Sequence, residues 1–221
     1  MKLGLYIIYL ACIFVSLAAA IFQRKELFKR KVGFFIPYLS YVFLQEITLG
    51  VVNYVNPDFK TNIVYNIYRV LTVIFFAAFF SRVTFMKKFH SAILWSAIAF
   101  VLISIVDHSF YEPITAPSSI LNLIRGFILI SYGILFLASY MQIDSPKLEH
   151  YWRPFLWITI GIVIFYPVIS IVIYLQSYLN AMSAMLGPFK LYQLIPQLMS
   201  IFMYSCFTYA FYLCRKIKEP I

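Results

Sequence analysis

The sequence predicts an all-α, polytopic membrane protein built as a seven-transmembrane-helix bundle. Hydrophobic residues make up 63% of the 221 residues and charged residues only 12%, whereas a soluble domain has roughly 45–50% apolar and about 25% charged residues. Seven stretches of the chain approach the roughly 20 apolar residues that a helix needs to cross the hydrocarbon core. This composition excludes a soluble enzyme and a nucleic-acid-binding protein, and it predicts a multi-pass protein of the cell (inner or plasma) membrane.

The predicted spans alternate with charged or turn-rich segments. The spans cover residues 3–22, 33–55, 63–80, 91–107, 119–140, 154–175 and 190–213. The connecting segments are QRKELFKRK, NPDFKTN, SRVTFMKKFH, DHSFYEPITAPSS, QIDSPKLEHYWRP and QSYLNAMSAMLGPFK. These connections are short, so residues 1–221 are expected to form a single seven-helix domain without an attached output module.

The distribution of basic residues predicts the orientation in the membrane. The segments after the first, third and fifth spans, together with the C-terminal tail, hold 13 of the 18 Lys and Arg residues. The opposite side holds Lys2, Lys60 and Lys190. Because Lys and Arg accumulate in cytoplasmic loops, the N-terminus is expected outside and the C-terminus in the cytoplasm.

Three ionisable side chains fall inside the predicted spans. Glu46 lies in the second span, Arg69 in the third and Arg125 in the fifth. Such groups cost at least about 2.5–3.5 kcal/mol each to insert, so they usually face the interior of a bundle and mark functional sites. Both arginines come six residues after their span begins, about 9 Å below the outer surface at 1.5 Å per residue. All three groups are therefore expected at a similar level in the outer half of the membrane.

Polar residues with helical spacing surround these charges. The third and fifth spans both contain an N-x-x-R motif, and the second, sixth and seventh spans also carry polar stripes; all five stripes are most polar in their outer halves. The candidate ligand-binding residues are Glu46, Asn66, Arg69, Asn122, Arg125, Tyr166, Gln193 and Gln197. Together they predict an interior cavity that opens to the outside.

Two arginines against one carboxylate predict a site for a small anionic or zwitterionic solute. The planar guanidinium suits carboxylate and phosphate groups, and Glu46 would serve as a counter-ion or as the partner of an amine. Two structural alternatives remain. Glu46 would pair with one arginine while the polar stripes hold the helices together, or the arginines would extend to the outer headgroups.

Catalytic, metal and cofactor chemistry is not predicted. No P-loop, G-x-S-x-G or H-E-x-x-H motif occurs, and the three histidines are far apart in the sequence. The last span lacks the lysine that a retinal pigment needs in its middle. The protein is therefore expected to be neither an enzyme nor a cofactor-binding protein.

The chain resembles a group of small, uncharacterised bacterial seven-helix membrane proteins that look like sensory input modules. The resemblance lies in the helix layout, the N-x-x-R stripe and the aromatic run from Phe75 to Phe80. It implies a sensor or receptor-like role, with a separate cytoplasmic signalling protein as partner. Membrane lipid is the other expected partner, since the basic segment from Arg24 to Lys31 suits anionic headgroups.

An alternative resemblance is to small seven-helix sugar transporters of the Pro-Gln-loop type, carried by Ile195-Pro196-Gln197. That family is expected to have a matching Pro-Gln in its first half, where this chain has Ile36-Pro37-Tyr38. A transporter also needs polar stripes that reach the inner side, whereas the inner halves here are mainly Phe, Leu, Ile and Val. A non-catalytic structural subunit of a membrane complex is the remaining alternative. The ligand and the oligomeric state are not predicted.

Overall fold

The computed structural model describes residues 3–56, 59–116, 118–182, 185–186 and 189–216. Its seven long helices are α1 (Leu3–Phe22), α3 (Phe35–Val55), α4 (Asn62–Ser81), α5 (His90–Phe110), α6 (Ser119–Tyr140), α7 (Pro146–Tyr174) and α9 (Leu191–Lys216). In the described residues, seven helices are long and apolar enough to cross a membrane. The prediction of an all-α protein with seven membrane-spanning helices is confirmed at this level.

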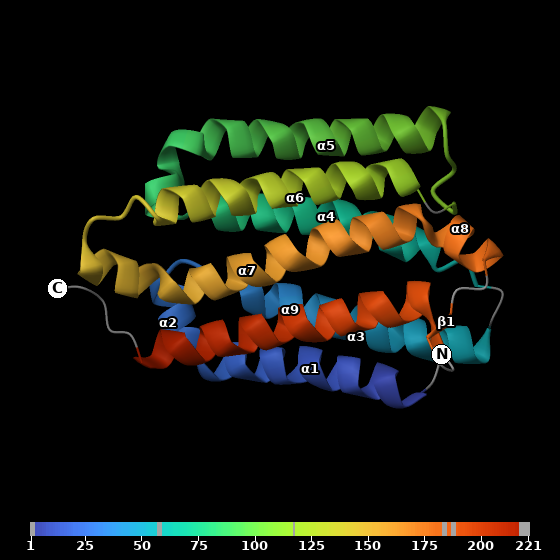
Figure 1. The fold of residues 1–221 in the computed structure, drawn as a ribbon, viewed down its shortest axis with the longest axis horizontal. Helices are drawn as coiled ribbons and strands as arrows, with labels where there is room; N and C mark the ends of the chain where they lie inside the picture. Colours follow the sequence, from blue (N-terminus) through green and yellow to red (C-terminus); the bar gives the residue numbers. More distant parts are fainter. Residues whose placement is uncertain (1–2, 57–58, 117, 183–184, 187–188, 217–221) are drawn as a thin grey trace.

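The helices form an elongated bundle with α5 at one edge and α1 at the other (Figure 1). Helix α7 packs on both α6 and α9, α9 packs on α1, and α3 joins the bundle chiefly through α1. We call the end where α1 begins the N-terminal face and the opposite end, where α9 finishes, the C-terminal face (Figure 1). Lys2 and Lys218, which contribute to the predicted charge distribution, lie outside the described residues.

Short elements that the hydropathy pattern does not predict connect the long helices. They are α2 (Arg24–Lys29), the 3₁₀ helix η1 (Thr84–Phe89), α8 (Gln176–Ala181) and a hairpin of β1 (Met185–Leu186) and β2 (Phe189–Lys190). Helix α7 also begins eight residues before the predicted span, with Pro146 in its first turn. Proline is favoured there because its missing N–H would have no intrahelical partner.

Phenylalanine side chains fill the half of the bundle next to the C-terminal face. The ring of Phe35 is fully buried and lies 4.8–5.6 Å, centroid to centroid, from the rings of Phe75, Phe79 and Phe211. Phe207 lies 5.8 Å from it. We call these five residues the phenylalanine cluster. They join α3 to α4 and α9, where edge-to-face ring contacts add to ordinary packing.

Glycines allow close approach between α6 and α7. A Cβ atom at Gly126 would collide with Ser170, and one at Gly133 would collide with Val163. Small residues at helix crossings are typical of membrane bundles, because lipid supplies no hydrophobic driving force and stability depends on tight packing. The α6–α7 contact brings Asn122, Arg125 and Tyr166 together.

Replacing Gly133 by valine is expected to destabilise the bundle by about 1–3 kcal/mol, since the added methyl groups have no space. Thermal unfolding of the purified protein in detergent measures this as a lower melting temperature. Gly4→Val is the matched control, because a Cβ at Gly4 would meet nothing within 4 Å. Equal melting temperatures for the two variants would contradict the close-packing argument.

Candidate functional site

Arg69 and Arg125 lie inside the bundle, as the sequence predicts. Arg69 is only 4% exposed and Arg125 only 6% exposed. The Nε of Arg69 donates a hydrogen bond of 3.1 Å to Oδ1 of Asn122, so the arginine of one N-x-x-R motif binds the asparagine of the other. The guanidinium of Arg125 lies 5.4 Å from the ring centroid of Tyr166. Helices α4, α6 and α7 thus bring together five of the predicted residues, with Asn66 one turn before Arg69.

The asparagines anchor the two motifs to the connecting segment between α5 and α6. Nδ2 of Asn66 donates to the carbonyls of Ile114 and Ala116 at 2.7 and 3.0 Å. Nδ2 of Asn122 donates to the carbonyl of Ser118 at 3.2 Å, and the Ser118 hydroxyl caps α6 by accepting from the Leu121 amide. This network fixes the level of both arginines, and Asn66 serves to position the site.

The guanidinium groups retain unused donors. Nη1 of Arg69 and Nε of Arg125 are buried and lack a hydrogen-bond partner. In the part of the chain that the structure describes, the one ion pair within 4.0 Å joins Lys29 to Glu26 at the C-terminal face, so neither arginine forms one. A buried donor without a partner costs about 1–3 kcal/mol, and more when charged. An anion placed between these atoms would remove that cost.

Two carboxylates that the sequence analysis treated as loop or span-end charges also belong to this region. Asp107 and Glu112 attract the Arg69 guanidinium, while Arg125 repels it. Each acid has a buried carboxylate oxygen without a hydrogen-bond partner. Asp107 lies within α5, because that helix continues to Phe110 instead of ending at residue 107. Around Arg69 the formal charges therefore balance, and the positive excess that the sequence predicts is offset.

Tyrosines occupy the space between the arginines and Glu46. The hydroxyls of Tyr38 and Tyr68 lie 3.2 Å apart, and Tyr68 is within electrostatic reach of both Tyr166 and Tyr204. The ring of Tyr204 is 6.4 Å from that of Tyr9. Of these tyrosines, only Tyr166 is among the ligand-binding residues that the sequence predicts. The signal for the others was present, since Tyr204 belongs to the polar stripe of the last span.

Glu46 makes no ion pair within 4.0 Å with either arginine in the described chain. Its carboxylate approaches the Tyr9 hydroxyl, whereas the charged groups acting on Arg69 are Arg125, Asp107 and Glu112. Gln193 donates to the Tyr192 hydroxyl at 3.3 Å, and Gln197 is partly buried in α9. Helical periodicity gives the level and face of these residues, but it does not give the lateral distances between helices.

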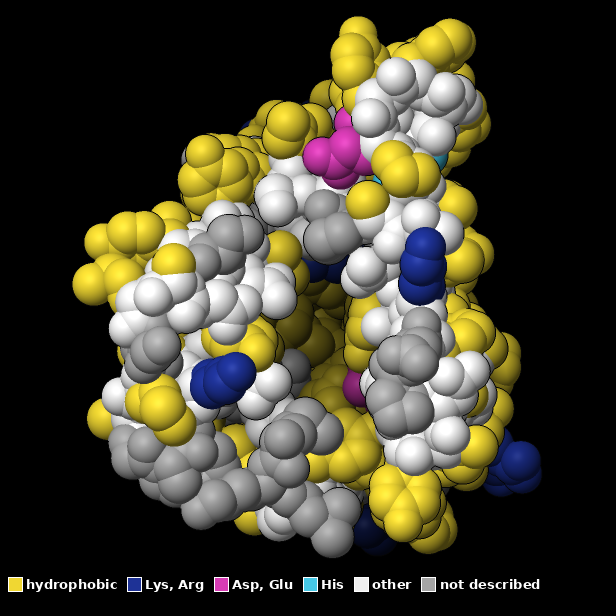
Figure 2. All heavy atoms as spheres, turned by 90° about the vertical axis from the view of Figure 1, so that its right-hand side faces the viewer, with side chains coloured by type: hydrophobic (Ala, Val, Ile, Leu, Met, Phe, Trp, Pro, Cys, Tyr) yellow, Lys and Arg dark blue, Asp and Glu magenta, His cyan; other side chains and the backbone are white. Residues whose placement is uncertain are grey.

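The N-terminal face is hollowed at its centre. In Figure 2 the hollow has a largely hydrophobic lining, with Lys or Arg atoms visible at one side of it and Asp or Glu atoms at the other. Helices α4 and α6 begin at this face and carry Arg69 and Arg125 in their first halves, whereas Glu46 lies near the middle of α3. The hollow therefore lies at the same end of the bundle as the two arginines.

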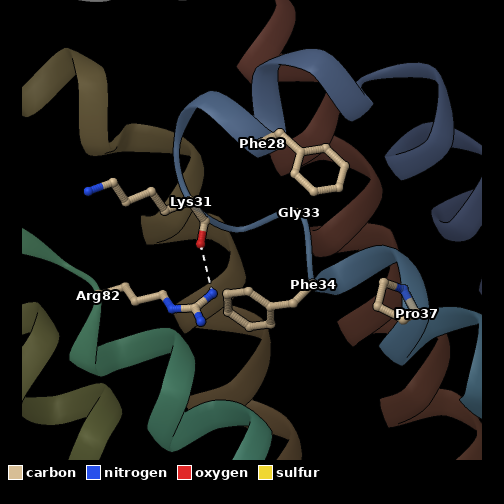
Figure 3. A pocket seen from close by; sticks show the side chains of 6 residues that line it. All are labelled: Phe28, Lys31, Gly33, Phe34, Pro37 and Arg82. Atoms are coloured by element: carbon tan, nitrogen blue, oxygen red, sulfur yellow. Dashed lines mark hydrogen bonds between the residues drawn. The ribbon is translucent and has the colours of Figure 1, made fainter.

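A second pocket, of about 610 Å³, lies at the C-terminal face. Figure 3 shows Arg82 stacked on Phe34 and hydrogen-bonded to the carbonyl of Lys31, with Phe28 on the far side of Gly33. The Arg82 guanidinium lies 4.3 Å from the Phe34 ring centroid. The pocket is lined by residues of α2, of the segment between α2 and α3, and of α3, together with Arg82, which directly follows α4. It is not part of the arginine region.

Comparison of the chain with known protein families, with curated proteins and with solved structures found no match. Across the described ranges, no group of three or more His, Cys, Asp or Glu residues is arranged to hold a metal ion.

Proposed function

We propose that the protein is a sensor or receptor-like membrane protein with a cavity for a small anionic or zwitterionic ligand. The observation that carries the proposal is the pair Arg69 and Arg125. Both side chains are buried and within electrostatic reach of each other, and their unused donors face no carboxylate within 4.0 Å in the described chain. Buried charges held in this way are costly in a purely structural subunit and are explained by a ligand.

The orientation follows from the charges at the two ends. The C-terminal face carries five exposed basic residues, namely Arg24, Lys25, Lys29, Lys31 and Arg82, and this supports a cytoplasmic position for that face, because Lys and Arg accumulate in cytoplasmic loops. The hollow then opens to the outside of the cell membrane. Signal output would pass from the C-terminal face to a separate cytoplasmic protein, and the Arg82 pocket lies at the surface where such a partner or lipid headgroups would bind.

The phenylalanine cluster favours sensing over transport. A transporter needs a polar path on both sides of its site, whereas the half of the bundle beyond Tyr38 is filled by buried aromatic rings. Ligand binding on one side of such a plug would instead act through helix movement. Pro167 and Pro196, which lie inside α7 and α9, are positions where a helix bends readily.

Binding is tested by thermal unfolding of the purified protein with acetate, succinate, inorganic phosphate and glycine as probes. A probe present at 100 times its Kd is expected to stabilise the protein by about 2.7 kcal/mol, and Arg69→Gln should remove this effect. Arg24→Gln, at the C-terminal face, is the control. The proposal fails if no probe raises the melting temperature of the unmodified protein. It also fails if the probes stabilise Arg69→Gln as much as they stabilise the Arg24→Gln control and the unmodified protein.

A further inference from the structure

Glu46 lies in an aromatic site of its own. The Tyr6 hydroxyl donates 2.6 Å to the backbone carbonyl of Glu46, which joins α1 to α3 at this level. Gly50, one turn later, leaves room for this contact, since a Cβ there would collide with the Tyr6 hydroxyl. The carboxylate approaches Tyr9, and Tyr65 and Tyr204 are within its electrostatic reach.

No basic side chain meets this carboxylate within 4.0 Å among the described residues. An acidic side chain at this depth is unfavourable in a membrane unless it is protonated or accompanied by a cation. The rings of Tyr6, Tyr9 and Tyr204 are tilted by 46–48° from one neighbour to the next, with centroids 6.1 and 6.4 Å apart. Tyrosine rings arranged around a carboxylate are the chemistry by which proteins hold organic ammonium ions.

We infer that Glu46 and the tyrosines Tyr9, Tyr65 and Tyr204 bind an alkylammonium group. A metal ion fits less well, because hard cations need six or more oxygen ligands, whereas this site offers one carboxylate among phenol groups. The ring faces give an organic cation contacts that neither a metal ion nor a proton can use.

The ammonium site and the arginine region lie at nearly the same depth. Glu46 comes nine residues before the end of α3, and Arg69 comes seven residues after α4 begins, which are about 14 and 11 Å along their helices from the N-terminal face. Tyr68, within reach of Tyr9, Tyr166 and Tyr204, lies between the two sites. The ligand is therefore a zwitterion whose two charges are separated by a flexible chain that passes the tyrosines, with its ammonium group at Glu46 and its acid group at the arginines; this second step rests on the proposed function.

Tetramethylammonium and methylammonium chloride test the ammonium site alone, with sodium chloride at equal ionic strength as reference. Both ammonium salts are expected to raise the melting temperature of the unmodified protein in a saturable manner. Glu46→Gln should weaken this binding at least tenfold, and Tyr204→Leu should weaken it while Tyr204→Phe, which keeps the ring, retains it. Arg69→Gln should not weaken it, and Glu26→Gln at the C-terminal face is the matched acidic control.

6-(Trimethylammonio)hexanoate, in which a flexible chain separates the two charges, tests the combined site and is expected to bind at least tenfold more tightly than tetramethylammonium or acetate. The inference is overturned if Glu46→Gln and the unmodified protein respond equally to the ammonium salts, or if sodium or pH alone reproduces the response. Ammonium binding that needs Glu46, without any acid binding, would contradict the proposed function and keep the ammonium site. Acid binding that needs Arg69, without any ammonium binding, would contradict the ammonium site and keep the proposed function.

Discussion

Replacing Arg125 by methionine is expected to raise the melting temperature of the ligand-free protein and to remove its stabilisation by small acids. In the described structure Arg125 makes no hydrogen bond; its contact is with the ring of Tyr166 at 5.4 Å. Its Nε is buried without a partner, and it repels Arg69. Methionine fills a similar elongated space without the charge, so only the cation–π contact is lost, worth up to about 2 kcal/mol.

The expected gain in stability is about 1–2 kcal/mol, because the effective desolvation penalty of an unpaired buried ion is several kcal/mol. In a protein of this size that gain corresponds to roughly 2–8 °C. The expected loss in binding is about 10- to 100-fold, since a hydrogen bond to a charged group contributes about 1.5–3 kcal/mol. Melting temperatures measured with and without the best acid probe give both quantities.

Arg24→Met at the exposed C-terminal face is the control, and it is expected to change neither quantity. The opposite pattern, in which Arg125→Met unfolds the protein or lowers its melting temperature while acid binding persists, would assign Arg125 a structural role. Stabilisation together with lost binding is characteristic of a residue retained for function at a cost in stability.

Helical periodicity predicted the part of the site that lies within single helices. The spacing of Asn66 with Arg69, and of Asn122 with Arg125, places each pair on one helix face. The structure brings the two motifs together through the hydrogen bond from Arg69 to Asn122. Burial and side-chain orientation were predictable here because charged and amide groups avoid lipid in every helix of a bundle.

Relations between helices were not predictable in the same way. The separation of Glu46 from the arginines depends on which helices pack side by side, and α3 packs chiefly on α1. The contribution of Asp107 and Glu112 depends on where α5 ends and how the following segment folds back. Hydropathy indicates only that a span ends nearby, so it cannot show that a carboxylate at that end points into the bundle.

The balance of charge changes the ligand that the site favours. From the sequence, two arginines face one carboxylate, and a simple anion would suffice. In the structure Asp107 and Glu112 act on Arg69, and Glu46 adds a third carboxylate next to the tyrosines. A simple anion would be attracted by the arginines and repelled by these acids, whereas a zwitterion places each of its charges opposite a complementary group.

Replacing Phe35 by alanine is expected to destabilise the protein by about 2–3 kcal/mol. In soluble proteins a buried phenylalanine contributes about 3–5 kcal/mol by this measure; the value is smaller here because part of it is transfer from water, which lipid does not provide. Phe35 is fully buried at the centre of the phenylalanine cluster, so the cavity would open between α3, α4 and α9. The expected fall in melting temperature is roughly 4–12 °C.

Phe127→Ala is the matched control, because Phe127 is 70% exposed on the outside of α6 and its loss should leave the melting temperature nearly unchanged.

A second measurement, of ligand uptake into liposomes, connects the phenylalanine cluster to function. If the cluster closes the inner half of the bundle, liposomes containing the unmodified protein should not take up labelled 6-(trimethylammonio)hexanoate. Uptake by the unmodified protein, saturable and dependent on Arg69, would contradict the sensor proposal and favour the transporter, because the rings would then have to separate during each cycle.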